Sequence, residues 1–150
     1  MGLFGSKENP EDVMYSAMSM MEKNQPKAAV SLFNKVLKQD SENVSALLNK
    51  GLALNQIKKY SDAVTCFEKL LEINPKDAQA YNNKGIAMAE MKNIQSAAEC
   101  YDKAIEADPK YAASYFNKGV LFDKLQEHEE AIQALDKAIS IEPRKPNAIV

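Results

Sequence analysis

A repeat of fixed length is the feature that most constrains the fold of this 150-residue chain. The tripeptide Asn49-Lys50-Gly51 recurs as Asn83-Lys84-Gly85 and again as Asn117-Lys118-Gly119, at a spacing of 34 residues each time. A shift of the whole sequence by this interval also aligns Ala29, Ala63, Ala97 and Ala131; Phe33, Phe67, Tyr101 and Leu135; Lys35, Lys69, Lys103 and Lys137; and Pro75, Pro109 and Pro143. A period of this length indicates stacked copies of one small unit.

Each unit carries two helical patterns. The first has apolar residues at intervals of three and four, as in Val44, Leu47, Leu48, Leu52 and Leu54, and the second has them at Val64, Phe67, Leu70 and Leu71. Such spacing predicts two amphipathic helices. Ser61 is predicted to cap the start of the second helix, and Asn74-Pro75 to end it, because a residue before proline is pushed out of helical geometry. In the first unit, Asn9, Pro10 and Pro26 predict the two helix starts. Each unit is therefore predicted to be a helix hairpin.

A glycine lies inside the first predicted helix of three units, at Gly51, Gly85 and Gly119. Glycine in a helix interior costs about 1 kcal/mol relative to alanine. Its recurrence in one register predicts that the second helix approaches closely at this point. The small side chains of Ala63, Ala97 and Ala131 are predicted to meet these glycines, with Phe67, Tyr101 and Leu135 filling the space around the contact.

The pattern closely resembles the tetratricopeptide repeat family. Its marks are plain in the third unit, which reads Tyr81, Gly85, Met88, Ala97, Tyr101, Ala104 and Pro109. The resemblance divides the chain into a flexible leader (1–9), four repeats within 10–145 (10–43, 44–77, 78–111 and 112–145) and the start of an incomplete fifth repeat (146–150). It implies an all-α fold, a right-handed α-solenoid of four helix hairpins with about eight helices.

The resemblance also implies a function, which is to bind an extended peptide or protein segment in a concave groove lined by the first helices. Asn49, Asn83 and Asn117 lie two residues before the glycines and are expected to face this groove. An amide side chain both donates to and accepts from a peptide backbone. The other expected groove residues are Leu48, Leu52, Asn82, Ile86, Phe116, Val120, Met14 and Met18, and the two methionines are predicted to be exposed. The alternative is a structural or oligomerisation module, a fragment of a longer repeat array, with no groove ligand.

One family use is predicted to be absent. Cochaperones of this family clamp a terminal carboxylate with lysine and arginine in the groove. The matching positions here hold Met14 and Met18 or Leu48 and Leu52, and further along Gln79 and Asn83 or Ala113 and Asn117. Only the inward asparagine agrees with that pattern, so no carboxylate clamp is expected.

Composition excludes several further classes. Nineteen Lys and Arg balance 21 Asp and Glu for a formal net charge of −2, whereas nucleic-acid-binding domains usually carry a strongly basic face, so no nucleic acid partner is expected. His128 is the single histidine, and Cys66 and Cys100 lie one repeat apart, too widely spaced for an easy disulfide. The chain is therefore expected to be non-catalytic and to need no metal or cofactor.

The two ends of the sequence give two further expectations. No signal-peptide pattern is present, which favours a cytoplasmic location. The first residues fit the N-myristoylation pattern at Gly2, and even an acylated chain would bind membranes only marginally. At the other end, Ile132, Leu135 and Ile139 lie on the last predicted helix with no following helix to cover them. A homo-oligomer formed through the C-terminal repeat (112–150) is the resulting hypothesis.

Overall fold

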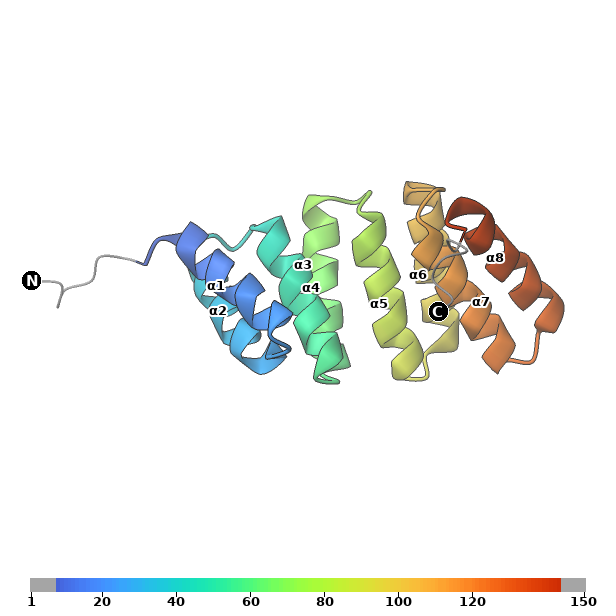
Figure 1. Cartoon of the computed structure of the whole chain (residues 1–150), viewed down its shortest axis with the longest axis horizontal. Helices are drawn as coiled ribbons and strands as arrows, with labels where there is room; N and C mark the ends of the chain where they lie inside the picture. Colours follow the sequence, from blue (N-terminus) through green and yellow to red (C-terminus); the bar gives the residue numbers. More distant parts are fainter. Residues whose placement is uncertain (1–7, 144–150) are drawn as a thin grey trace, which may run out of the picture. The chain divides into compact units, whose positions relative to one another are not determined.

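The computed structural model describes residues 8–143, which form eight α-helices and no strand (Figure 1). The helices are α1 (Pro10–Glu22), α2 (Pro26–Gln39), α3 (Val44–Gln56), α4 (Tyr60–Ile73), α5 (Ala78–Glu90), α6 (Ile94–Ala107), α7 (Ala112–Lys124) and α8 (His128–Ile141). They divide into two compact units, residues 8–73 and residues 74–143. The all-α class and the helix hairpins predicted from the sequence are confirmed. The leader and the start of a fifth repeat lie outside the described residues, apart from residues 8 and 9.

Helix starts follow from residues that satisfy free backbone amides. The Asn9 side chain accepts a hydrogen bond from the Glu11 amide at 3.0 Å, and α1 and α2 each begin with a proline, as predicted. Asn43 caps α3 through the Ala46 amide at 2.9 Å, and Asp77 caps α5 through the Ala80 amide at 2.9 Å. Substitution of such caps by alanine typically costs about 1 kcal/mol, so these residues help to place the helix boundaries.

The turn inside each hairpin has only three residues, and this corrects one prediction. After α3, Lys58 adopts a left-handed conformation with φ 63°, and the Lys59 amide donates to the Leu54 carbonyl at 2.8 Å. The Lys58 amide also donates to the Asn55 carbonyl, at 3.1 Å, and the two bonds together form a Schellman motif at the end of α3. Because the turn is so short, α4 already begins at Tyr60. The prediction that Ser61 caps α4 is therefore wrong, and its carbonyl instead accepts from Thr65 Oγ1 at 3.2 Å.

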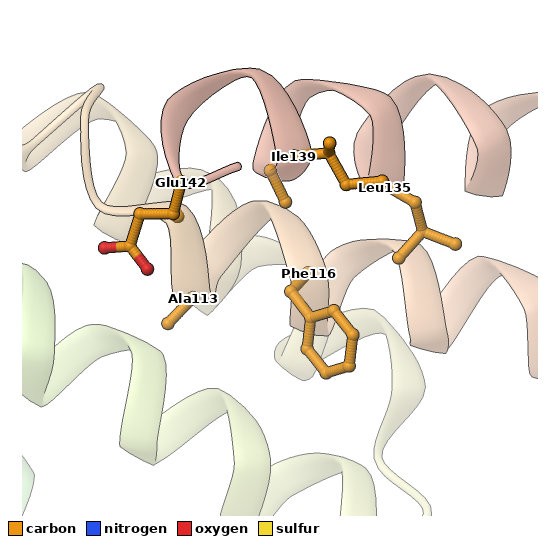
Figure 2. Close-up of a pocket in the computed structure, with 7 residues that line it drawn as sticks. Ala113, Phe116, Leu135, Ile139 and Glu142 are labelled. Carbon is orange, nitrogen blue, oxygen red and sulfur yellow. The ribbon is translucent and has the colours of Figure 1, made fainter. Parts of the chain in front are cut away.

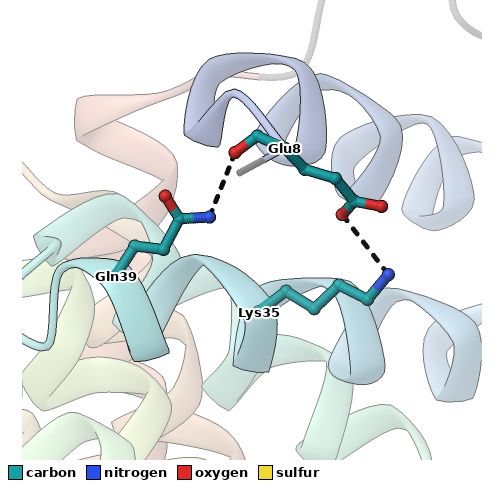
Figure 3. A network of polar contacts seen from close by, with 3 residues as sticks. All are labelled: Glu8, Lys35 and Gln39. Carbon is teal, nitrogen blue, oxygen red and sulfur yellow. Dashed lines mark hydrogen bonds and ion pairs between the residues drawn. The ribbon is translucent and has the colours of Figure 1, made fainter. Parts of the chain in front are cut away.

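In the unit formed by residues 8–73, α3 packs against both helices of the hairpin α1–α2, and α4 packs on α3. Val13, Ala17, Ala29, Phe33, Val36 and Ala46 form one buried cluster from three helices. Polar contacts also fix the segment before α1, because Glu8 pairs with Lys35 at 3.4 Å and its carbonyl accepts from Gln39 at 3.1 Å (Figure 3).

In the unit formed by residues 74–143, α7 packs against both helices of the hairpin α5–α6, and α8 packs on α7. A core cluster of Ala97, Tyr101 and Leu121 joins α6 to α7. Within each unit, the first helix of a hairpin therefore covers the hairpin that precedes it. This arrangement places α1 beside α3 and α5 beside α7.

The recurring glycines lie where the helices of a hairpin come close, as predicted, but their partner is not the one predicted. A Cβ built on Gly51 would lie 2.4 Å from Cε1 of Phe67, and one on Gly85 would lie 2.6 Å from Cε1 of Tyr101. The expectation that the alanines would meet the glycines is corrected at these two positions, because the aromatic rings are the nearest neighbours of the glycines. At Gly119, Leu135 is nearest, at 2.7 Å, and the Ala131 carbonyl follows at 3.2 Å.

Candidate peptide-binding faces

The face of α1 and α3 holds the methionines and leucines predicted for the groove. Leu48 and Leu52 are half-buried on α3. Met14 and Met18 are also half-buried, and both pack against the core cluster that α1 shares with α2 and α3. The predicted exposure of these methionines is therefore wrong. The long, unbranched side chains reach apolar neighbours that shorter residues at these positions would miss.

The side chains of Asn49 and Asn83 donate hydrogen bonds to backbone carbonyls of their own helices. Asn49 Nδ2 donates to the Ser45 carbonyl at 2.9 Å, and its distance to Ser45 Oγ is 3.4 Å. Asn83 Nδ2 donates to the Gln79 carbonyl at 2.8 Å, one turn back along α5. Both amides therefore turn Nδ2 toward the helix backbone.

Asn117 on α7 is held differently, by a buried residue of the neighbouring helix α5. Its Nδ2 donates to Asn82 Oδ1 at 3.0 Å, and Asn82 is only 3% exposed. The Asn82 side chain also hydrogen-bonds Tyr111 in the loop before α7. Burial, and next the Asp77 carboxylate, raises the pKa of the Tyr111 phenol above its usual value. Asn82 was expected in the groove, and the structure shows that it supports Asn117 from beneath.

A small pocket of about 100 Å³ lies between α5 and α7. It brings together three residues predicted for the groove, Ile86, Asn117 and Val120. Ala89, Tyr101 and Leu121 complete its apolar lining, and Glu90 and Lys124 add one charge of each sign. The face therefore combines an apolar recess with a fixed amide, which is the chemistry needed to seat an apolar side chain beside a peptide backbone.

The residues predicted for self-association do not share one environment. Ile132 and Ile139 on α8 are 58% and 60% exposed, and Phe116 on α7 is 54% exposed. Leu135 is half-buried and turned toward Gly119. It also lines a second pocket, of about 620 Å³, together with Ala112, Ala113, Phe116, Ala138, Ile139 and Glu142 (Figure 2). The sequence analysis did not predict Ala138 as a site residue. Its place could have been inferred from the 34-residue register, which aligns it with the buried Ala104.

The next features are the potential metal ligands, the cysteine thiols and the apolar character of the helices in the described residues. Within residues 8–143 no group of three histidine, cysteine, aspartate or glutamate side chains is placed to hold a metal ion. Cys66 and Cys100 are buried free thiols, and burial raises the pKa of Cys66, which disfavours a reactive thiolate. None of the eight described helices has both the length and the apolar character that a membrane span requires. The N-myristoylation pattern at Gly2 lies outside the described residues.

Comparison with known proteins agrees with this architecture. The family model of the Psidin N-terminal TPR repeats region matches residues 14–144. A solved structure of MamA (41–end) from Desulfovibrio magneticus RS-1 is similar at a TM-score of 0.82 and 26% identity, with 91% of this chain and 77% of that chain covered. A crystal structure of MamA is 31% identical at a TM-score of 0.75, covering 85% and 74% of the two chains.

A third solved structure, TTC0263, a thermophilic TPR protein of Thermus thermophilus, shares the fold at a TM-score of 0.80. Its identity is 18%, over 89% of this chain and 75% of that chain. No match was found among the curated proteins.

Proposed function

Because the chain belongs to the tetratricopeptide repeat family and is a protein-interaction scaffold, we propose that the inner faces of its first helices bind an extended segment of a partner protein. The pocket between α5 and α7 carries the proposal. There Ile86, Val120 and Tyr101 form an apolar recess, and Asn117 stands at its edge with its amide fixed by Asn82. The partner expected from this chemistry is an extended peptide with an apolar side chain opposite the recess.

Asn117 keeps hydrogen-bonding capacity for such a partner. An asparagine amide has two N–H donors and a carbonyl acceptor, and the bond to Asn82 uses one donor. The second N–H and the carbonyl oxygen complement the carbonyl and amide of a peptide unit. Each bond of this kind contributes about 0.5–1.5 kcal/mol net. Binding is therefore expected to depend on backbone conformation and on one apolar side chain, with little reading of charge.

Binding of a library of extended peptides to the full chain, measured by fluorescence polarisation, tests this function. Val120→Lys places a charge in the recess, and Asn83→Ala with Asn117→Ala removes the amides; each is expected to weaken binding at least tenfold, about 1.4 kcal/mol. Gln95→Lys, on the exposed side of α6, adds the same charge and is expected to leave affinity unchanged. Equal peptide affinities for the V120K and Q95K variants would show that the peptide does not bind at this recess.

The exposed isoleucines of α8 favour a second candidate function, self-association through the C-terminal repeat. Ile132 and Ile139 lie seven residues apart on one helix face and are both largely exposed. Sedimentation velocity across a range of concentrations measures this directly. Association is expected to be lost in Ile132→Glu, while Glu129→Gln, elsewhere on α8, leaves it intact. If the chain is a monomer at every concentration and still binds a peptide, self-association is excluded and peptide binding remains as the function.

A further inference from the structure

Tyr15 on α1 carries the most exposed aromatic ring in the described residues 8–143, and it is 79% exposed. The 34-residue period places it in the register of Asn49, Asn83 and Asn117. Each of those asparagines is half-buried and donates a hydrogen bond to an oxygen of the chain. The first repeat therefore presents an uncovered ring on its inner face, where the other three present an amide held by an intramolecular bond.

The ring stands on an apolar face to which two helices contribute. Met14 and Met18, its neighbours on α1, are half-buried and pack against the core cluster. Leu48 and Leu52 on α3 are half-buried as well, and α3 lies beside α1 in this unit (Figure 1). A single apolar side chain on a polar surface needs no functional explanation. This ring instead extends an apolar face outward into solvent, where a ligand can reach it.

A carboxylate without an ionic partner lies next to the ring. Glu11 precedes Tyr15 by four residues. This spacing places the two side chains on one helix face, with about 5–6 Å between their Cβ atoms. Helical side chains lean toward the N-terminus, so the ring leans toward the turn that holds Glu11. Glu11 is exposed, and its carboxylate forms no ion pair within residues 8–143.

The lysines of the neighbouring elements face other groups. The helix α1 itself contains neither lysine nor arginine. On α2, Lys35 pairs with Glu8 at 3.4 Å, and Lys38 lines a recess with the same glutamate. Burial raises the pKa of the Cys66 thiol on α4, and Lys50 opposes this shift, so Lys50 of α3 lies toward α4. The carboxylate beside the ring therefore keeps its charge for a ligand.

The ring and the carboxylate occur together in the first repeat alone. In the other three repeats the register of Glu11 holds Ser45, Gln79 and Ala113, and the register of Tyr15 holds asparagine. A planar cation complements both groups. The guanidinium of arginine stacks on aromatic faces and donates paired N–H bonds to a carboxylate, whereas the ammonium of lysine is a compact, strongly hydrated charge.

We propose that Tyr15 and Glu11 form a subsite for an arginine side chain of the partner segment. The guanidinium stacks on the ring of Tyr15 and donates hydrogen bonds to the carboxylate of Glu11. The subsite rests on the proposed function, since it requires a partner that lies on the inner faces of the first helices. It adds the recognition of one positive charge to the backbone and the apolar side chain that the pocket between α5 and α7 recognises.

Short peptides titrated into the full chain test the subsite. The probe is a capped pentapeptide with one central arginine among alanines, and copies with lysine or citrulline at the centre are its controls. Citrulline keeps the planar shape of the arginine side chain but carries no charge. Nuclear magnetic resonance follows binding through the ring signals of Tyr15 and the methyl group of Met18. We expect both to shift, and the arginine probe to bind at least about threefold more tightly than either control.

Four variants locate the selectivity. Tyr15→Asn, which installs the residue type of the other repeats, and Glu11→Gln are each expected to abolish the preference for arginine over citrulline, as measured at the Met18 methyl group. Tyr15→Phe keeps the ring and should keep the preference. Glu42→Gln removes the same charge at an exposed position of the loop before α3 and is the matched control. A loss of stability alone leaves the preference unchanged, because all three probes meet the same folded fraction.

Two results would overturn the subsite. Equal affinities for the arginine and citrulline probes would show that no charge is recognised. A preference that survives Tyr15→Asn would show that the ring only covers the methionines beneath it. Val120→Lys, which disrupts the recess between α5 and α7, is expected to leave the arginine preference intact. Failure of the recess to bind peptides is therefore distinguished from failure of this subsite.

Discussion

The ring of Phe67 rests directly on the backbone of Gly51. A Cβ built on this glycine would lie 2.4 Å from Cε1 and 2.6 Å from Cζ of the ring, closer than real Cβ atoms approach. Phe67 is fully buried, so its ring has no open space into which to move. The glycine of the repeat thus leaves room between α3 and α4 for the ring of Phe67.

Gly51→Ala is expected to destabilise the unit formed by residues 8–73. The gain in helix propensity is about 1 kcal/mol, and overpacking of a filled core costs about 1–3 kcal/mol. Because the clash is with a ring that cannot move, overpacking is expected to outweigh the gain in helix propensity, with a net loss of up to about 2 kcal/mol. Urea-induced unfolding followed by circular dichroism measures the change.

A double-mutant cycle identifies the clash as the cause. Phe67→Ala alone is expected to cost about 3–5 kcal/mol through the cavity it leaves. On that background Gly51→Ala should no longer destabilise, since the added methyl group enters the cavity. Additive losses in the double variant would mean that the ring is not what opposes the alanine.

The sequence predicts that helices approach at the glycines but not which side chain they meet. A 34-residue period aligns Ala63 and Phe67 equally well with Gly51, and the two lie one helical turn apart. Which of them faces the glycine depends on the rotation of α4 about its axis, which follows from packing on the whole of α3. The misplaced cap at Ser61 has a similar origin, because the left-handed Lys58 shortens the turn without any glycine to signal it.

For the candidate site, too, the sequence predicts which positions are equivalent but not the contacts that each residue makes. Register places Asn49, Asn83 and Asn117 at one position, yet their hydrogen bonds differ. Asn49 and Asn83 bond to backbone carbonyls of their own helices, and Asn117 bonds across to Asn82. Within its own unit, Asn117 meets an amide acceptor on the preceding first helix, Asn82 of α5, whereas the equivalent position of α1, relative to Asn49 on α3, holds Met14, which offers no such acceptor. A period reports equivalent positions, whereas the bonding at each depends on the residues where the repeats differ.

Ser114→Ala is expected to stabilise the unit formed by residues 74–143. Ser114 is fully buried on α7, and its hydroxyl has no hydrogen-bond partner among the described residues. A buried hydroxyl without a partner costs about 1–3 kcal/mol, and Ala46 shows that alanine fits this register. Thermal unfolding should show a higher midpoint for the variant, and the reverse change, Ala46→Ser, a lower one. A lower midpoint for Ser114→Ala would mean that the hydroxyl is satisfied in solution.

Tyr101→Phe is expected to matter only in alkaline solution. Burial, and to a smaller extent the neighbouring Cys100 thiol and Glu90 carboxylate, raises the pKa of the Tyr101 phenol in the folded chain. A tyrosine in the unfolded chain ionises near pH 10. Above that pH the unfolded state releases a proton that the folded state retains, so the contribution of Tyr101 to stability is lost as the pH rises.

The phenylalanine variant lacks this proton and should resist alkaline unfolding better than the native chain. At pH 7 the two should be nearly equal, because Phe33 and Phe67 occupy the same register fully buried. Unfolding midpoints in urea between pH 7 and pH 11 measure the difference. Parallel pH profiles for the two chains would show that Tyr101 does not ionise on unfolding.

Asn117→Ala is expected to cost more stability than Asn49→Ala, although the two residues share one register. Removal of the Asn117 amide leaves Asn82 Oδ1 buried without that donor, at a cost of about 1–3 kcal/mol. Asn49 bonds at an exposed position on its own helix, where the loss is expected to stay within about 0.5 kcal/mol. Combining Asn117→Ala with Asn82→Leu, the residue type found at position 48, should recover part of the loss, since the buried amide oxygen is removed while the Tyr111 phenol loses its bond to Asn82. Urea titrations of the native chain and the three variants give these differences. Equal losses for Asn117→Ala and Asn49→Ala would mean that the bond between Asn82 and Asn117 does not stabilise the packing of α7 on α5.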